Sequence, residues 1–294
     1  MSRLNIQQLP KDKNFLKCFT AAKGHKLVYS DINSLEPHVL AHFSKDPGLM
    51  ALYGPNAKPN DVYLYVGSKI NAWKDNILEH YDPENPTPEG IAAAKKHAKA
   101  ERTAVKPAYL GWMYGLGAGT MSQNTEIPVD ECKLILADID KAFPGVVDFN
   151  ERLKEEWEDN GGWIKQEWVI DPNTGRNIPK FIDGRPGWIY NGRGRPLGVA
   201  PDKVKDLGNR FVQSTGHDVL MQMLVFINEM RVDTMRPYNV DVHDATIWQV
   251  REDKVDEAIK VFNDAYTRLN EALQWDVKIK GEVEVGDNLG NFLE

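Results

Sequence analysis

The chain has 294 residues, of which 41% are hydrophobic and 10% aromatic, so it can bury a substantial core as one large domain or two smaller ones and is not a disordered chain. It has neither a charged leader followed by an apolar stretch nor a run of about 18 apolar residues, so we expect a cytoplasmic protein without a membrane partner. Two distant cysteines, Cys18 and Cys132, predict neither a disulfide framework nor a thiolate metal site.

The net charge of -7 at pH 7 is unfavourable for binding nucleic acid, because lysine and arginine carry phosphate binding. The charge is uneven along the chain. Acidic residues concentrate in 126–160 and 251–294, whereas 95–106 and 185–205 are locally basic. A cationic groove on an acidic body is therefore compatible with the sequence.

The first elements place an aspartate at the end of a strand. Residues 26–32 (KLVYSDI) predict a short strand, and 34–44 predict a helix with apolar residues on one side and Pro37 in its first turn. Asp31 is thus expected where the strand ends.

The next stretches are helical by composition. Residues 61–80 predict helix between two loops rich in proline and asparagine, and 90–116 is rich in alanine and lysine. Within the second stretch, Pro107 predicts either a kink or the start of a new helix.

The remainder of the chain alternates helices with short strands. Residues 130–158 predict one or two amphipathic helices, 161–200 small hairpins, and 204–231 a long helix with a buried apolar stripe. Residues 239–250 alternate like two strands folded back on each other, and 253–273 again have helical periodicity.

Two strand-end aspartates are candidate metal ligands. Mg²⁺ prefers carboxylate and carbonyl oxygens, so Asp31, with the carbonyl of Ile32 beside it, could form half of a metal site. Asp244, after Val242-His243, offers a second carboxylate at the predicted hairpin tip. Taken singly, an aspartate such as Asp31 at a helix start is usually a helix cap, and Asp244 could equally form a turn.

Two polar patterns with four-residue spacing are candidate ligand-binding faces. The first begins with two cations that could hold a triphosphate and ends with an aromatic and a glycine that could lie against a base pair. It consists of Arg102, Lys106, Leu110, Tyr114 and Gly115. The second, Lys205, Asn209 and Gln213, could donate hydrogen bonds to minor-groove acceptors. In isolation, a solvated basic helix end followed by core residues is the favoured explanation of the first pattern, and ordinary surface polarity is the alternative explanation of the second.

The order of these motifs resembles DNA polymerase family A, the family of bacterial polymerase I. The Asp31 segment resembles motif A, RTAVKPAYLGWMYG at 102–115 resembles motif B, and VHD at 242–244 resembles motif C. Further resemblances occur in collinear order over nearly the whole chain, at NIQQLP (5–10), NGRGRPLG (191–198), QSTGHD (213–218) and VEVGDNLGNF (283–292). Their joint occurrence is the strong part of the resemblance, because each alone is only modestly specific.

The resemblance implies an α+β fold, a polymerase palm made of an antiparallel sheet with flanking helices and an inserted, mostly helical fingers subdomain. The palm would comprise 1–54 and 200–294, and the fingers 55–199. The implied activity is template-dependent addition of dNMP to a primer 3'-hydroxyl, with two Mg²⁺ ions, for which Mn²⁺ could substitute. Primer-template DNA and a dNTP are then the expected partners.

The resemblance also implies roles for single residues. Asp31 and Asp244 would ligate both metals, with the Ile32 carbonyl, and Glu36 would exclude a ribose 2'-hydroxyl. Arg102 and Lys106 would bind the triphosphate, and Lys106 could protonate the leaving pyrophosphate. The residues implied to contact the nascent base pair, primer terminus or duplex are Tyr114, Gly115, Lys205, Asn209, Gln213 and His243.

Four positions depart from the family pattern. Leu110 stands where an aromatic usually stacks on the incoming sugar, and Tyr63 where a histidine commonly touches the triphosphate. Ala245 replaces a usual glutamate in motif C, and Lys205 replaces an arginine and so loses its two-pronged donor. These departures are expected to affect discrimination between sugars, metal affinity and binding of the primer.

The helical thumb and the 3'-5' exonuclease domain that usually precede NIQQLP in the family are expected to be absent. A second polypeptide is therefore expected to supply them, as in a split, phage-type polymerase. Two alternatives stay open, a non-catalytic DNA-binding or assembly subunit with the palm-fingers fold and a single-subunit RNA polymerase. Glu36 argues against the RNA polymerase, because a group that collides with the 2'-hydroxyl suits deoxynucleotides.

Overall fold

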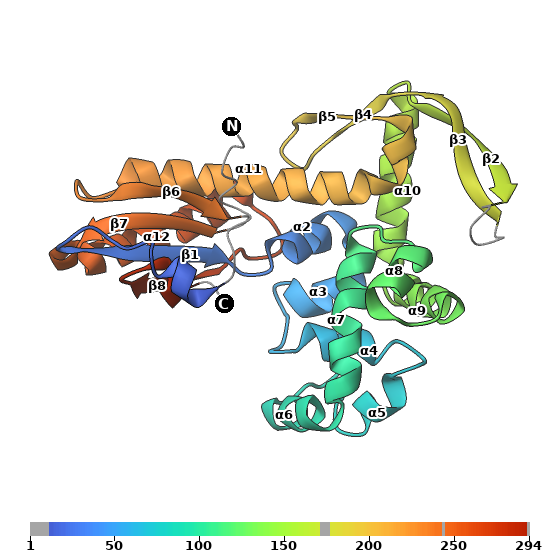
Figure 1. Ribbon diagram of the computed structural model, residues 1–294, viewed down its shortest axis with the longest axis horizontal. Coiled ribbons are helices and arrows are strands. Elements are labelled where there is room, and N and C mark those ends of the chain that lie inside the picture. Colours follow the sequence, from blue (N-terminus) through green and yellow to red (C-terminus); the bar gives the residue numbers. More distant parts are fainter. Residues whose placement is uncertain (1–11, 171–176, 243–244, 293–294) are drawn as a thin grey trace. The chain divides into compact units, whose positions relative to one another are not determined.

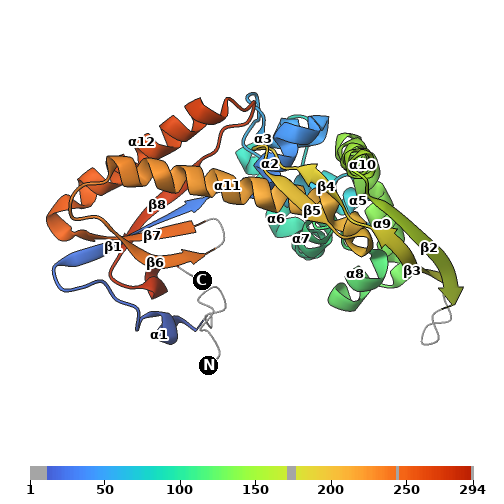
Figure 2. The same ribbon diagram turned by 90° about the horizontal axis from the view of Figure 1, so that it is seen from above.

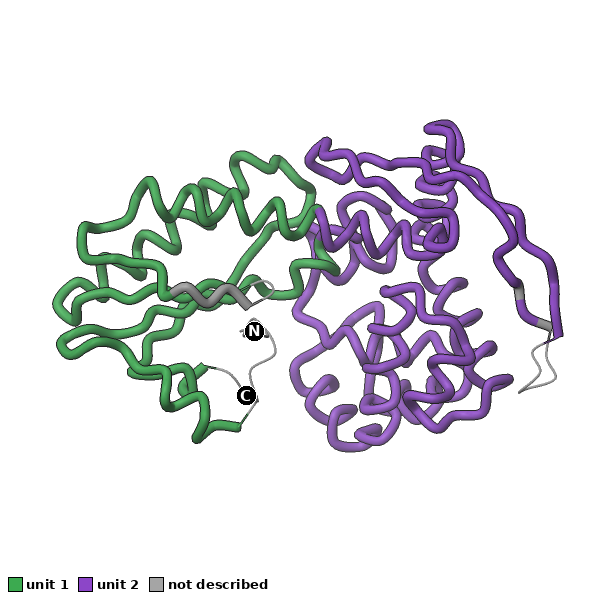
Figure 3. Tube along the Cα trace, turned by 45° about the horizontal axis from the view of Figure 1, so that its top comes forward, with its two compact units in different colours: residues 1–38, 215–294 green, residues 39–214 purple. Residues whose placement is uncertain are grey.

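The computed structural model describes residues 12–170, 177–242 and 245–292. Its internal contacts divide the chain into two compact units (Figure 3). We call residues 1–38 and 215–294 the sheet unit, and residues 39–214 the helical unit. The functional division into 1–54, 55–199 and 200–294 stays a prediction.

A four-stranded antiparallel sheet forms the centre of the sheet unit, in the order β6-β7-β1-β8 (Figure 1). Its strands are β1 (His25–Ile32), β6 (Arg236–Val242), β7 (Ala245–Arg251) and β8 (Gly281–Gly286). The predicted strand at 26–32 and the predicted strand pair at 239–250 are thereby confirmed. The hairpin tip that joins the pair, His243 and Asp244, lies outside the described residues.

Helix α12 (Val255–Leu273) packs against one face of this sheet, in agreement with the predicted helix at 253–273 (Figure 2). The Tyr266 hydroxyl lies 3.0 Å from Ser30 Oγ and donates to the Asp31 carbonyl at 3.2 Å. Gly281 permits this approach, because a Cβ there would lie 1.8 Å from the Tyr266 hydroxyl and 2.2 Å from the Asp31 carbonyl. Tyr266 of α12 thus fixes the position of the end of β1.

The opposite face of the sheet is covered at one end by the helix α1 (Lys13–Leu16) and the 3-10 turn η4 (Leu289–Asn291). Tyr29 stacks on Phe292 there, with ring centroids 5.1 Å apart. The buried residues of this cluster are Leu16, Leu27, Tyr29, Ala245, Ile247 and Leu289. A short 3-10 turn, η3 (Glu252–Lys254), links β7 to α12.

The long helix predicted at 204–231 is α11 (Leu207–Met230), preceded by the 3-10 helix η2 (Pro201–Asp206). Its predicted apolar stripe is buried, and includes Val219, Leu220, Met223 and Ile227 in the sheet unit. None of the helices in the described parts of the chain combines the length and apolar character that crossing a membrane needs.

Besides η2 and the first residues of α11, the described part of the helical unit contains nine α-helices, because proline, glycine and capping aspartates interrupt the chain often. They are α2 (Leu35–Ser44, which begins in the sheet unit), α3 (Pro47–Tyr53), α4 (Val62–Gly67), α5 (Lys74–Leu78), α6 (Pro88–His97), α7 (Lys99–Met113), α8 (Ala118–Thr125), α9 (Val129–Ala142) and α10 (Pro144–Asp159). Phe143, buried between α9 and α10, lies 5.5 to 6.3 Å from the rings of three other aromatics, Tyr65, Tyr109 and Trp112.

Buried carboxylates join helices that are distant in the sequence. Asp46 caps α3 through the N–H groups of Gly48 and Leu49, and also accepts from Gly145 N–H at 2.8 Å. Asp138 of α9 accepts from the backbone N–H of Asn71 at 2.9 Å and from its side-chain amide at 3.0 Å. Both carboxylates therefore satisfy backbone donors that burial would otherwise leave unpaired.

The predicted helical character of 61–80 is confirmed, in the form of two short helices, α4 and α5. A helix start at Pro107 is wrong, because α7 begins at Lys99 and continues through Pro107. The break lies instead at Ala98, whose backbone (φ -97°, ψ 41°) is not helical.

The predicted small hairpins at 161–200 are confirmed. Strands β2 (Trp163–Ile170) and β3 (Asn177–Arg185) pair antiparallel, as do β4 (Gly187–Tyr190) and β5 (Pro196–Val199). The fully buried Trp157 of α10 donates its indole N–H to the Val199 carbonyl at 2.9 Å, so the second hairpin is fixed to this helix.

Candidate active site

In the sheet unit, Asp31 is the second-last residue of β1, which lies between the strands β7 and β8. Its direct partners are Ala245 on β7 and Glu282 on β8. Directly opposed residues of antiparallel strands point to the same face, with Cβ atoms about 4.5–5.5 Å apart. The half-buried Asp31 thus has a small apolar neighbour on one side and an exposed carboxylate on the other.

Of the other site residues predicted in the sheet unit, two are described by the structure and two are not. Ile32 is buried and pairs with Gly281, and Glu36 is half-buried in the first turn of α2. Asp244 and His243 lie outside the described residues, so the predicted convergence of Asp31 and Asp244 stays a prediction. Glu282 was not singled out in the sequence, because only the strand register reveals that it opposes Asp31.

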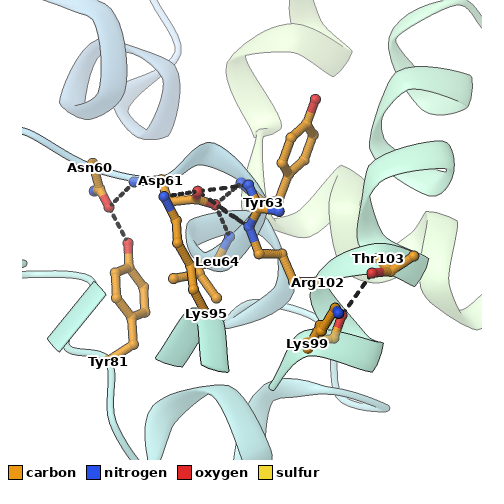
Figure 4. A network of polar contacts seen from close by, with 9 residues as sticks. All are labelled: Asn60, Asp61, Tyr63, Leu64, Tyr81, Lys95, Lys99, Arg102 and Thr103. Carbon is orange, nitrogen blue, oxygen red and sulfur yellow. Dashed lines mark hydrogen bonds and ion pairs between the residues drawn. The ribbon is translucent and has the colours of Figure 1, made fainter. Parts of the chain in front are cut away.

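In the helical unit, a buried carboxylate organises the predicted phosphate-binding residues (Figure 4). Asp61 caps α4 by accepting from the N–H groups of Tyr63 and Leu64, each at 3.1 Å. The same carboxylate accepts from Arg102 Nη2 at 2.9 Å and Nε at 3.2 Å, and lies 3.1 Å from Lys95 Nζ. One aspartate therefore fixes cations from α6 and α7.

The electrostatics of Asp61 follow from these contacts. Its side chain is only 7% exposed. Burial by itself would raise the pKa of Asp61, but the hydrogen bonds from Arg102, Leu64 N–H and Lys95 outweigh burial and hold that pKa below its usual value. The carboxylate is consequently ionised at neutral pH, and it carries one negative charge against two cations.

The ring of Tyr63 lies beneath both predicted phosphate-binding cations of α7. Arg102 Cζ is 5.2 Å from the ring centroid and Lys106 Nζ is 5.8 Å from it, within the range of cation–π attraction. Burial raises the pKa of Tyr63, with the effect of Arg102 opposing it, so the phenol keeps its proton and can donate a hydrogen bond. Tyr63, Arg102 and Lys106 thus form one cluster, which we call the cation cluster.

The end of α7 approaches the region before α11. Leu110 is half-buried, and Tyr114, the last-turn cap, is 40% exposed. Gly115 has a left-handed backbone (φ +71°), and a Cβ there would lie 3.2 Å from the Lys205 carbonyl. The structure therefore brings two of the predicted duplex-binding segments together, and glycine suits the junction.

The predicted polar stripe is split between two elements. Lys205 is exposed in η2, whereas Asn209 and Gln213 lie one turn apart in α11. Asn209 Oδ1 is buried without a hydrogen-bond partner among the described residues. An acceptor in this state is available to a donor from a bound molecule.

In the helical unit, Asp61 and Lys95 are two residues of the cluster that the sequence did not indicate. Asp61 precedes Tyr63 by two residues and has the local pattern of a helix cap, which is its other role here. Lys95 is 34 residues away from Asp61 in the chain, so no local signal could have paired them.

Comparison with known proteins identifies relatives of this chain. The family model described as DNA polymerase family A matches residues 1–167. A DNA polymerase of Mycobacterium phage D29 is 26% identical over 260 residues, covering 86% of this chain and 34% of the relative. The thermostable DNA polymerase I of Thermus thermophilus is 22% identical over 286 residues, covering 96% of this chain and 29% of the relative. The chain therefore spans about a third of the length of these relatives.

A solved structure shares the fold. It is the POL domain of Pol1 from M. smegmatis, in complex with DNA primer-template and dNTP, with a TM-score of 0.69. The identity is 18%, and the alignment covers 98% of this chain and 45% of that one. The predicted α+β fold class is thereby confirmed.

Proposed function

Since the chain belongs to DNA polymerase family A, whose model matches more than half of it, we propose that it is the catalytic part of a DNA-directed DNA polymerase. It would add dNMP to a primer 3'-hydroxyl under the direction of a template strand. The observation that carries this proposal is the cation cluster. Two cations of α7 one helical turn apart, with the phenol of Tyr63 from α4 beside them, are chemically suited to a triphosphate.

The proposed metal site uses oxygen donors of the sheet unit. Asp31 offers a half-buried carboxylate at a strand end, and Glu282 adds a negative charge across the strand. Oxygen donors of this kind suit hard cations such as Mg²⁺, for which Mn²⁺ could substitute. We assign two such ions to Asp31, the Ile32 carbonyl and Asp244, the residue before Ala245. Bound there, they would supply Lewis-acid chemistry, favouring proton loss from the primer 3'-hydroxyl and neutralising phosphate charge.

The residues of the helical unit would bind and neutralise the nucleotide. Arg102 and Lys106 would hold the β- and γ-phosphates, Tyr63 would donate a hydrogen bond to them, and Lys106 Nζ would give a proton to the leaving pyrophosphate. Asp61 would act on this step indirectly, because it fixes the guanidinium of Arg102 before the nucleotide arrives. Such preorganised charge contributes most to phosphoryl transfer.

The remaining residues would select the sugar and hold the duplex. Glu36 would fill the space that a ribose 2'-hydroxyl needs, and Leu110 would pack near the incoming sugar. Tyr114 and Gly115 would border the nascent base pair. The residues proposed to contact the primer or the minor groove are Lys205, Asn209, Gln213 and His243.

The chain spans only 29–34% of the length of the relatives named above. We further propose that a second polypeptide, carrying a thumb and a 3'-5' exonuclease, helps to grip the duplex and to proofread. Such an assembly would work in the cytoplasm of a bacterial host. Primer extension by the purified chain, with and without a candidate partner, tests this; processive synthesis by the chain alone would disprove the need for a partner.

Primer extension also tests the activity itself. The chain, with primed template, dNTPs and Mg²⁺, should release pyrophosphate, and Asp31→Asn and Asp244→Asn should each reduce turnover by several orders of magnitude. Asp264→Asn, an exposed aspartate on α12, is the matched control and should leave turnover unchanged. Equal turnover in all four proteins would refute the assignment.

One structural feature favours a second function, a non-catalytic DNA-binding subunit. Ala245, beside Asp31, contributes no carboxylate to the site. The same experiment separates the two functions, because a binding subunit would retain primer-template DNA without releasing pyrophosphate. Incorporation of rNTPs in preference to dNTPs would instead indicate the RNA polymerase alternative.

A further inference from the structure

A second cluster of metal-binding side chains lies in the helical unit, apart from the residues assigned above. Glu79 and His80 directly follow α5, and His97 is the last residue of α6. Their ligand atoms, one from each residue, all lie within 4.8 Å of one another. The α5 and α6 helices pack against each other, which brings these residues together across the intervening loop.

The carboxylate of Glu79 lies between the two imidazoles. Its Oε2 is 3.0 Å from His97 Nε2, and its Oε1 is 3.9 Å from His80 Nε2. The two rings have centroids 4.6 Å apart and are inclined at 80°. Each imidazole therefore turns the same nitrogen, Nε2, toward one carboxylate.

This geometry is close to that of a zinc site. With bonds of about 2.0–2.2 Å and tetrahedral angles, two ligand atoms are about 3.3–3.6 Å apart. The observed separations lie on both sides of this range, and all three side chains are between 36% and 58% exposed, so small rotations would bring them into register. Two histidines and one carboxylate form a recognised zinc ligand set, which leaves the fourth position to water.

We propose that Glu79, His80 and His97 form a binding site for Zn²⁺ or a chemically similar transition-metal ion. The site differs in chemistry from the carboxylate site of Asp31, because imidazole nitrogen favours Zn²⁺ over Mg²⁺. An ion bound there would link the end of α5 to the end of α6. Since α6 also carries Lys95, whose Nζ lies 3.1 Å from Asp61, the ion would stiffen the helix that supports the cation cluster.

Metal titration of the untagged chain, stripped with a chelator and desalted, tests the site. Zn²⁺ binding is measured by calorimetry and Co²⁺ binding by visible absorption, both with excess Mg²⁺ present to occupy carboxylate sites. We expect one ion per chain and a tetrahedral Co²⁺ spectrum. Replacing a ligand should cost at least what removing an outer-shell partner costs, so His80→Gln and His97→Gln should each weaken binding by about tenfold or more.

Two controls make the result specific. His25→Gln, in the sheet unit, and Asp31→Asn should bind Zn²⁺ as tightly as the original chain does. Zn²⁺ should raise the melting temperature of the original chain and of His25→Gln, but not that of His97→Gln. Because the substituted side chains are exposed, circular dichroism should be the same for all variants.

Two results would overturn the proposal. Unchanged Zn²⁺ affinity in the His80→Gln, His97→Gln double variant would show that the ion binds elsewhere. Absence of binding to the original chain would reduce the cluster to a surface contact of Glu79 with His97 at 3.0 Å and with His80 at 3.9 Å. Either result is independent of polymerase activity.

Discussion

Asp61→Asn isolates the charge that fixes Arg102 and Lys95. Asparagine caps helices about as well as aspartate does, so the hydrogen bonds to Tyr63 N–H and Leu64 N–H should survive the change. What disappears is one negative charge within 3.1 Å of Lys95 Nζ and 2.9 Å of Arg102 Nη2.

The expected cost follows from these contacts. A hydrogen bond to a charged group contributes about 1.5–3 kcal/mol. The Arg102 side chain is 33% exposed and that of Lys95 is 47% exposed, so solvent screens both and the lower part of the range applies. We expect Asp61→Asn to lower the free energy of unfolding by about 2 kcal/mol, and to raise the KM for dNTP because Arg102 loses its anchor.

Urea denaturation of a double-mutant cycle measures this contribution. The four proteins are the original chain, Asp61→Asn, Arg102→Gln and the double variant, and the coupling free energy should be about 1–2 kcal/mol. Asp46→Asn, another buried capping aspartate, serves as a comparison for loss of a cap charge. A coupling free energy near zero would refute the structural reasoning.

The same variant has a predicted pH dependence. The pKa of Asp61 is lowered in the folded chain, so its stabilisation is complete above the unfolded value of about 3.9 and is lost as pH falls through the folded value. The difference in unfolding free energy between the original chain and Asp61→Asn should be constant from about pH 5 to 8 and shrink in acid. A difference that persists unchanged at about pH 2 would contradict this linkage.

Three further predictions concern the sheet unit. Burial lowers the pKa of His38, so the unfolded chain binds a proton there more readily, and the free energy of unfolding should fall as pH drops through about 6.5. His38→Gln should flatten this pH dependence, measured by urea denaturation. An unaltered pH dependence would contradict the role of His38. Glu36→Ala should raise rNTP relative to dNTP incorporation by about tenfold, equivalent to about 1.4 kcal/mol, in single-nucleotide extension; an unchanged ratio would remove Glu36 from sugar selection. Glu282→Gln should raise the Mg²⁺ concentration for half-maximal activity about fivefold, because a negative charge about 5 Å from Asp31 contributes about 1 kcal/mol to cation binding in a partly solvated site. An unchanged Mg²⁺ requirement would show that Glu282 does not contribute to metal binding.

Much of the fold could be predicted because its longest elements have clear periodicity. The strand β1 and the helices α11 and α12 agree with their predicted positions to within a few residues. The division of the helical stretch 61–80 into two helices involves a tertiary contact. Asn71, between α4 and α5, gives its backbone N–H to Asp138 at 2.9 Å, a partner 67 residues away that no local pattern contains.

The cations of the candidate site could be predicted from the sequence, but the residues that hold them in place could not. Arg102 and Lys106 follow from helical spacing, but Asp61 and Lys95 join them only through packing of α4, α6 and α7. The roles of the predicted residues stay predictions. At Pro107 only the alternative of a helix start is wrong, since α7 continues through this local helix breaker and packs against α4 and α9.

The close approach of Tyr266 to the backbone at Asp31 has a genetic consequence. The phenol and the bare backbone of Gly281 fit together on the side of the sheet away from the Asp31 carboxylate. Any larger residue at 281 would displace either the phenol or the strand. A screen for inactive variants should therefore recover positions 266 and 281 alongside the acidic residues, although their effect on turnover would come from a shifted main chain and would vary with temperature.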